Sequence, residues 1–238
     1  MRKENNSIIL EIGDTLYRYD LCENLPNIWD PNYHNIEYIY DGLGYKNSIG
    51  AIFLYSKKLA AERTLKNAIK NQASKGRNFT NATITSTRIE QEIKLLDLSS
   101  GIYKCSNLIS VLYELGIDVT TDRYYSYQKK VSFNCLHSSL MNLYSTEPKL
   151  KLNGAKEIND FFNHLTNLLG QSLTDFNNGH VFKRQLEDLL YEGYVFQETT
   201  TSDSDTYCIF SPNKLSNPEH ETIIIEDKEM IDLSNKRF

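Results

Sequence analysis

Apolar and polar positions fall in short blocks along the chain, and these blocks predict strands near both ends with helical material between them. Extended segments are predicted at 8–19 (two pieces hinged at Gly13–Asp14), 49–55, 193–198, 206–210 and 222–226. Helices are predicted at 57–71, 108–115, 136–152, 155–169 and 181–191, the last two as a hairpin around Asn177–Gly179. Residues 89–98 fit a helix or a strand, and 71–87 is interpreted as a polar connection.

This order of elements favours one α+β domain with a largely antiparallel sheet. The 238 residues are enough to bury a sizeable core, and neither an internal repeat nor a convincing linker divides them. We therefore treat 1–238 as one domain, with 155–192 as a helical insert and 227–238 as a tail.

Residues 49–69 are the most informative stretch. A mostly buried strand leads into a helix, and Ser56 is placed to cap the helix N-terminus. A helical wheel puts Leu59, Leu65 and Ile69 on one side, with Glu62 between the leucines.

A carboxylate in that position has two interpretations. Glu62 either sits at the edge of the apolar stripe, reaching solvent or pairing with Lys58 or Lys66, or points inward to line a cavity. The pattern alone favours the first.

Composition narrows the function classes. The net charge is −5, from 26 basic and 31 acidic residues, and no dense basic run indicates binding to nucleic acid or to an anionic membrane. Without a signal-like or membrane-spanning apolar segment, we expect a cytoplasmic protein. The four cysteines are widely spaced, which favours free thiols and predicts no metal site.

Three segments resemble the RES-domain family, named for Arg, Glu and Ser. The first is Tyr17-Arg18 followed by Tyr19; the second comprises Gly44, Asn47, Phe53-Leu54-Tyr55, Ala60-Ala61 and Glu62; the third comprises Gly193, Phe196, Ile209 and Phe210. Two positions differ from the family pattern. Phe53 stands where the family has Tyr, and the family Ser falls on Glu198, with Ser202 and Ser204 as weaker candidates. The basic residue expected near the Gly-rich stretch is missing unless Lys46 supplies it.

The resemblance implies an ADP-ribosyltransferase-like fold and activity on NAD⁺ as substrate, with no metal. It places Arg18, Glu62 and Glu198 in catalysis, and Arg18, Tyr19, Asn47, Phe53, Tyr55 and Ser202 at the dinucleotide. The residue types suit this chemistry. An arginine binds a pyrophosphate bidentately, aromatic residues stack on rings, and a carboxylate stabilises the oxocarbenium-like state that forms when nicotinamide leaves. If two carboxylates converge, one could instead activate the attacking water.

Each of these residues also has an ordinary structural interpretation. Arg18 fits a surface ion pair, Tyr19 and Phe53 fit the core, and Glu198 fits a solubilising charge on an edge strand.

Three functions follow as hypotheses. The first is an NAD⁺ glycohydrolase or phosphorylase acting as a bacterial toxin or defence effector. The second is a mono-ADP-ribosyltransferase with a protein or nucleic-acid acceptor, and the third is a catalytically inactive binding module. A toxin of this kind implies a neutralising antitoxin or immunity protein, for which the predicted strand at 222–226 is a possible docking edge.

Overall fold

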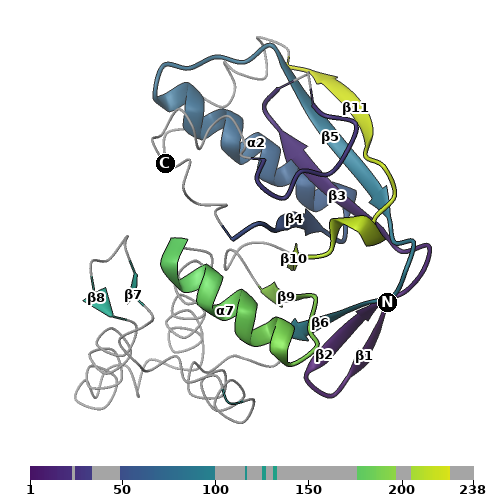
Figure 1. Ribbon diagram of the computed structural model, residues 1–238. Coiled ribbons are helices and arrows are strands. Elements are labelled where there is room, and N and C mark those ends of the chain that lie inside the picture. The colour runs from purple at the N-terminus through teal and green to yellow at the C-terminus, as the bar shows by residue number, and fades with distance from the viewer. Residues whose placement is uncertain are drawn as a thin grey trace, which may run out of the picture.

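Figure 1 shows the chain as a computed structural model built around one large sheet. The structure describes residues 1–22, 25–33, 49–99, 116, 125–126, 131–132, 176–196 and 205–225. Several predicted segments lie outside these ranges, namely the helices at 108–115, 136–152 and 155–169 and the tail at 227–238.

The sheet has nine strands in the order β1-β2-β6-β9-β10-β4-β3-β5-β11. Their bounds are β1 Arg2–Glu4, β2 Ser7–Leu10, β3 Thr15–Asp20, β4 Ile52–Tyr55, β5 Asn81–Arg88, β6 Ile93–Asp97, β9 Gly193–Phe196, β10 Thr206–Ile209 and β11 Glu219–Ile224. Neighbouring strands are antiparallel except β6 and β9. The prediction of an α+β domain with a largely antiparallel sheet is confirmed.

The remaining elements are two helices, a short 3₁₀ turn and a separate strand pair. They are α2 Lys58–Ser74, α7 Phe176–Asp188, η1 Pro212–Lys214, β7 Tyr125–Ser126 and β8 Val131–Ser132. Within the described part of the chain, no helix is long and apolar enough to cross a membrane.

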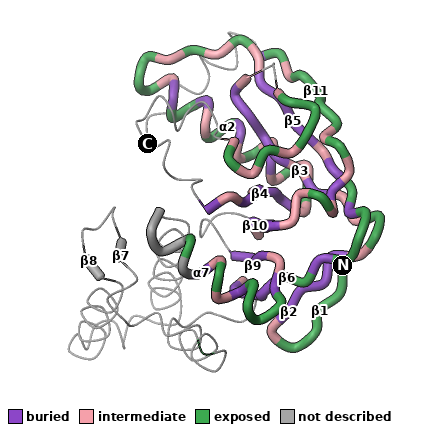
Figure 2. The backbone as a smooth tube through the Cα atoms, viewed as in Figure 1, coloured by how far each residue is buried: buried purple, intermediate pink, exposed green. Residues whose placement is uncertain are grey.

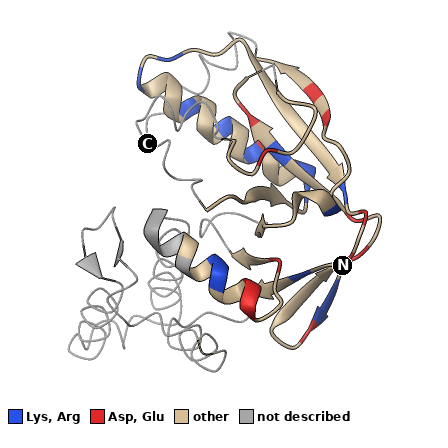
Figure 3. Cartoon of the chain, in the orientation of Figure 1, with Lys and Arg blue, Asp and Glu red and all other residues tan. Residues whose placement is uncertain are grey.

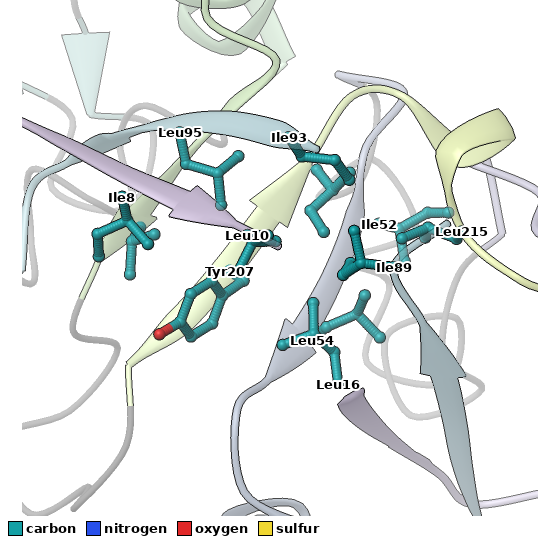
Figure 4. Close-up of a cluster of buried hydrophobic side chains, with 12 residues drawn as sticks. Ile8, Leu10, Leu16, Ile52, Leu54, Ile89, Ile93, Leu95, Tyr207 and Leu215 are labelled. Atoms are coloured by element: carbon teal, nitrogen blue, oxygen red, sulfur yellow. The ribbon is translucent and has the colours of Figure 1, made fainter. Parts of the chain in front are cut away.

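One face of the sheet carries the main apolar core (Figure 4). Alternate residues of the strands point into it, as the two-residue period of a strand requires. Its buried members are Ile8, Leu10, Leu16, Ile52, Leu54, Ile89, Ile93, Leu95, Val195, Tyr207, Ile209 and Leu215. Figure 2 shows the same distribution along the backbone, with buried segments in the inner strands and exposed ones in β1 and β11.

Helix α2 packs on the opposite face through a narrow stripe of side chains. Ala61, Leu65, Ile69 and Gln72 are buried against β3, β4 and β5. The outer side of the helix is basic, with Arg63, Lys66 and Lys70 exposed, and Figure 3 shows this row of positive charge. The helix is therefore amphipathic, as its sequence predicted.

Two details predicted for α2 are wrong. The N-cap residue is Lys57 with no side-chain cap hydrogen bond, so Ser56 does not cap the helix. The Leu59 side chain is 54% exposed, because the helix is rotated so that Ala61 rather than Leu59 faces the sheet.

Helix α7 packs on β9 through an aromatic contact. Phe182 is fully buried, and its ring meets the Tyr194 ring edge-on at a centroid distance of 5.2 Å. Tyr194 lies opposite Cys208 in β10, and Cys208 lies opposite Phe53 in β4, on the same side as α2. Residues 177–179, predicted as the turn of a helical hairpin, are part of α7.

The interpretation of 71–87 as a polar connection is wrong, because it contains most of β5. Three alternate residues of this strand, Thr83, Thr85 and Thr87, are buried threonines. The ambiguity at 89–98 is resolved as strand β6, and the predicted hairpin of β9 and β10 is confirmed. The last strand begins earlier than predicted and ends at Ile224.

Candidate functional site

The sheet divides next to the residues that the sequence singled out. Strand β3 meets β4 at a single register pair, Tyr17 opposite Tyr55, whereas it pairs with β5 at six positions. Beyond Tyr17, β3 continues with β5 and β11, and β4 continues with β10 and β9 (Figure 1). Arg18, Tyr19 and Asp20 therefore follow directly on the point of separation.

Arg18 and Asp20 form a buried ion pair on β3. Nε and one terminal nitrogen of Arg18 each lie 3.1 Å from a different carboxylate oxygen of Asp20, so the contact is bidentate. The two side chains are 8% and 1% exposed, respectively. Arg18 is thus not the exposed surface charge that a strand end usually carries.

The segment 25–33 covers this pair and contributes aromatic rings. The guanidinium carbon of Arg18 lies 4.8 Å from the centre of the Tyr33 ring, which is cation–π geometry. The Tyr33 hydroxyl lies 3.2 Å from the Cys22 sulfur. Burial, and next to it the negative charge of Asp20, raise the pKa of Tyr33 well above its ordinary value.

A hollow lies between this segment and the sheet. It is small: its cavity volume is about 20 Å³, room for about one water molecule, and the figure reaches about 270 Å³ only when open space toward solvent is included. Its lining residues are Arg18, Asp20, Leu25, Pro26, Ile28, Trp29, Asp30, Tyr33, Thr85, Pro218 and His220. The hollow combines a buried ion pair, a titratable imidazole and two aromatic rings, which is the mixture typical of small-molecule sites.

The buried threonines of β5 hold the surroundings of the hollow together. The Thr83 hydroxyl donates to the Cys22 carbonyl at 2.6 Å, and the Thr87 hydroxyl donates to the Ser216 carbonyl at 2.9 Å. The Trp29 indole nitrogen donates to the same Ser216 carbonyl at 2.9 Å. Each of these buried polar groups is satisfied, and the indole is fixed in place.

His220 links the sheet to segment 25–33. Its Nε2 lies 3.2 Å from the Pro26 carbonyl oxygen, and its Nδ1 lies 3.0 Å from the Thr85 hydroxyl. Because a carbonyl oxygen only accepts, Nε2 donates in this contact. Both ring nitrogens are thus engaged, which fixes the orientation of the imidazole at the edge of the hollow.

Tyr19 and Tyr55 lie on the other face of the sheet. Both are buried in the cluster that α2 covers, together with Ala61 and Leu65. Arg18 follows Tyr17 and precedes Tyr19, so its side chain points to the opposite side. Of the predicted dinucleotide-contacting residues, Tyr19 and Tyr55 share one face and Arg18 occupies the other.

Glu62 is at the flank of α2 and does not point inward. Its side chain is 35% exposed, and its Oε1 lies 4.0 Å from the ammonium of Lys58. The same ammonium is 2.6 Å from Glu221 on β11. This is the edge-of-stripe arrangement that the pattern favoured, and it does not bring Glu62 to the Arg18 hollow.

Phe53 is half-buried on β4, in register with Cys208 of β10. The other predicted site residues, Asn47, Glu198 and Ser202, lie outside the described residues.

Cys22 and Cys208 are reduced thiols, and burial raises the pKa of Cys208 well above its ordinary value, so it is a poor nucleophile. No group of three His, Cys, Asp or Glu residues in the described ranges is arranged to hold a metal ion.

The hollow contains functional candidates that sequence reasoning missed. Trp29, Asp30, Tyr33 and His220 reach it from segments without a helical or strand period, or from the exposed edge strand. The signal available in the sequence was the aromatic content of 25–33, which includes Trp29 and Tyr33. No protein-family profile, curated protein or solved structure matches this chain.

Proposed function

We propose that this chain is an NAD⁺-cleaving enzyme, a glycohydrolase or phosphorylase, with an ADP-ribosyltransferase-like fold of the RES type. The observation that carries the proposal is the order of strands around the division of the sheet. Leaving aside Gly44 and Asn47, which lie outside the described residues, the segments on which the resemblance rests fall in or directly beside the adjacent strands β3, β4, β10 and β9 and in the helix that follows β4. Segments far apart in sequence are thus neighbours in space, which a shared site requires.

The hollow beside Arg18 is the part of the described molecule best suited to bind the substrate. It lies at the Tyr-Arg segment of the resemblance and has aromatic walls for a ring. Its carboxylates, Asp20 and Asp30, are where positive charge on a departing nicotinamide ribosyl group would be stabilised. Under the proposal these carboxylates take the electrostatic role that the resemblance gives to Glu62.

The direct test is nicotinamide release from NAD⁺ by the purified chain, measured with and without phosphate. We expect release by the unaltered protein, and dependence on phosphate would distinguish phosphorolysis from hydrolysis. Asp30→Asn removes a carboxylate from the rim, and we expect it to slow release. Glu187→Gln on the exposed face of α7 is the matched control and should leave release unchanged.

Absence of release from the folded protein, with or without phosphate, would refute the proposal. The same reaction in cell lysate with labelled NAD⁺ then tests the second alternative, because an ADP-ribosyltransferase would label a protein or nucleic acid. A neutralising partner protein would be expected only if cleavage is observed.

A catalytically inactive binding module is favoured by one specific observation. Arg18 lies on one face of the sheet, whereas Glu62 sits on the helix that covers the other and is paired with Lys58. The described residues therefore do not assemble the arginine and glutamate of the family at one point. Binding of NAD⁺ by calorimetry, without nicotinamide release, would support this second function.

A further inference from the structure

Helix α2 and the residues that flank it concentrate positive charge. Residues 57–77 contain seven lysines or arginines and one acidic residue, and no acidic residue occurs from 63 to 89. The rest of the chain holds 30 of the 31 acidic residues, so this segment is strongly basic in a protein of net charge −5. Of the seven cations only Lys57 and Lys58 are adjacent, which is why the sequence shows no dense basic run.

The helical period brings the dispersed cations into one row. Arg63, Lys66 and Lys70 lie on the outer side of α2, Lys75 follows at its C-terminal end, and all four are exposed (Figure 3). At a rise of about 1.5 Å per residue, the row extends over about 18 Å. Among the described residues, no carboxylate forms an ion pair with Lys66 or Lys70. These two charges are therefore available to a ligand.

The row contains no apolar or aromatic side chain. The other exposed residues of α2 between Arg63 and Lys75 are Asn67, Asn71 and Ser74, and the buried apolar side chains of the helix face the sheet. A protein partner would need apolar area at the centre of the contact, and a membrane-bound helix would insert its apolar stripe. Lysine, arginine, asparagine and serine are side chains that contact the phosphates of nucleic acids. The composition of the row therefore favours a phosphate backbone.

A double helix is the form of nucleic acid that this row suits best. Double-stranded DNA carries about one negative charge per 1.7 Å of its axis, so a straight row of cations displaces many counterions from it. Proteins that hold single strands stack the bases on aromatic side chains, which the row lacks. The major groove of DNA admits an α-helix, whereas that of double-stranded RNA is too narrow. The acidic remainder of the surface does not prevent the contact, because about 0.1 M salt screens exposed charges more than roughly 10 Å apart.

We propose that the outer face of α2 binds the phosphate backbone of double-stranded DNA without sequence preference. The inference goes beyond the proposed function and does not depend on cleavage of NAD⁺. Helix α2 covers the face of the sheet opposite to the one from which Arg18 points, so this surface is separate from the Arg18 hollow. With four cations in contact, the logarithm of the binding constant should fall with the logarithm of the salt concentration with a slope of about −3 to −4.

The test is the fluorescence anisotropy of a fluorescein-labelled duplex of about 20 base pairs, titrated with the full chain at about 50 to 200 mM NaCl. We expect saturable binding at the lowest salt concentration and the slope given above. A second duplex of unrelated sequence should bind with the same affinity to within about twofold, because phosphate contacts carry no sequence information.

Two double variants separate the row from the overall charge. Lys66→Gln/Lys70→Gln removes two cations of the row and keeps a good helix former at each position. We expect it to bind DNA at least about tenfold more weakly at about 50 mM NaCl and to lose about two units of the salt slope. Lys94→Gln/Arg184→Gln removes the same charge from exposed positions on β6 and α7, and this matched control should change the affinity by less than about twofold. The melting temperature of each variant shows that it is folded.

The proposal is overturned if the unaltered protein does not bind the duplex at about 50 mM NaCl, or if Lys66→Gln/Lys70→Gln binds it as tightly as the unaltered protein does. It is also overturned if a single strand with the same number of phosphates, or double-stranded RNA, binds more tightly than duplex DNA. Tighter binding of poly-L-glutamate would indicate an acidic protein as the partner instead. Because no measurement uses NAD⁺, failure of the proposed function would leave a positive result standing.

Discussion

Replacing Arg18 by methionine should destabilise the protein strongly, because it takes the guanidinium away from the buried Asp20 carboxylate. Methionine retains an unbranched apolar stem, so the change removes mainly charge and hydrogen bonds. Removing one member of a buried ion pair typically costs about 3–5 kcal/mol. Loss of the cation–π contact with Tyr33 adds on the order of 0.5–2 kcal/mol. The free energy of unfolding, measured by urea denaturation at pH 7, should therefore fall by about 3.5–7 kcal/mol.

The loss should depend on pH in a defined direction. In Arg18→Met the buried Asp20 loses the positive charge of the guanidinium, so its folded-state pKa rises, because burial disfavours the charged carboxylate. A raised folded-state pKa means that stability is present at low pH and is lost as pH rises through that pKa. The variant should thus recover stability near pH 4–5 relative to the unaltered protein. Asp20→Asn should show no such recovery, since a buried arginine does not deprotonate.

The double variant Arg18→Met/Asp20→Asn completes the cycle. With both charges removed, most of the loss should be regained, giving a coupling energy of at least about 2 kcal/mol. The reasoning is refuted if Arg18→Met unfolds within about 1 kcal/mol of the unaltered protein at both pH values. A confirmed loss also means that reduced activity in any Arg18 variant has to be measured under conditions where the variant is folded.

Three further predictions concern the core and its charges. Gly193→Ala should prevent folding or lower the free energy of unfolding, measured in a urea titration, by more than about 4 kcal/mol, because the added Cβ would overlap a backbone carbonyl of β10. Gly76→Ala has open space around the added Cβ and should lower it by about 1 kcal/mol through backbone strain alone. Similar losses in the two variants would contradict this reasoning. Tyr194→Phe should change the melting temperature little, since the group that its buried hydroxyl meets among the described residues is the Cys208 thiol, a weak hydrogen-bond partner, and a clear fall would show that the hydroxyl makes a stronger bond. The pKa of Asp205 is raised by burial and then by the charge of Asp97, so stability from this group is lost as pH rises through its folded-state pKa. Asp205→Asn should therefore stabilise the protein at pH 7 more than at pH 4, and equal effects at both would refute the assignment.

The strands that could be predicted are those whose buried residues are apolar. The pieces on either side of Gly13, and the β9–β10 hairpin, are short runs rich in apolar and aromatic residues, and their strands are buried at nearly every position. Strand β5 is also buried on both faces but could not be found this way, because one of these faces consists of Thr83, Thr85 and Thr87. Their hydroxyls bind a carbonyl or an imidazole from other parts of the chain, and those partners become neighbours only in the fold.

The candidate site was predictable only in part, for a related reason. The sequence singled out Arg18 and the neighbouring aromatic residues, but adjacent residues of a strand point to opposite faces. A pattern along the chain therefore cannot place Arg18 and Tyr19 in the same cavity. Asp20, which determines the charge state of the hollow, was not noticed, because a bidentate pair two residues apart has no signature in a linear pattern.

The strand order has a consequence for synthesis of the chain. When residues 1–99 have been made, they can form two separate fragments, β1-β2-β6 and β4-β3-β5. Strands β9 and β10, almost one hundred residues later, are inserted between β6 and β4 and join the fragments. Until then, the inner edges of both fragments are open for pairing with other chains. A nascent or truncated chain ending before residue 193 should therefore aggregate, and any activity of the finished protein would begin only when its last strands are in place.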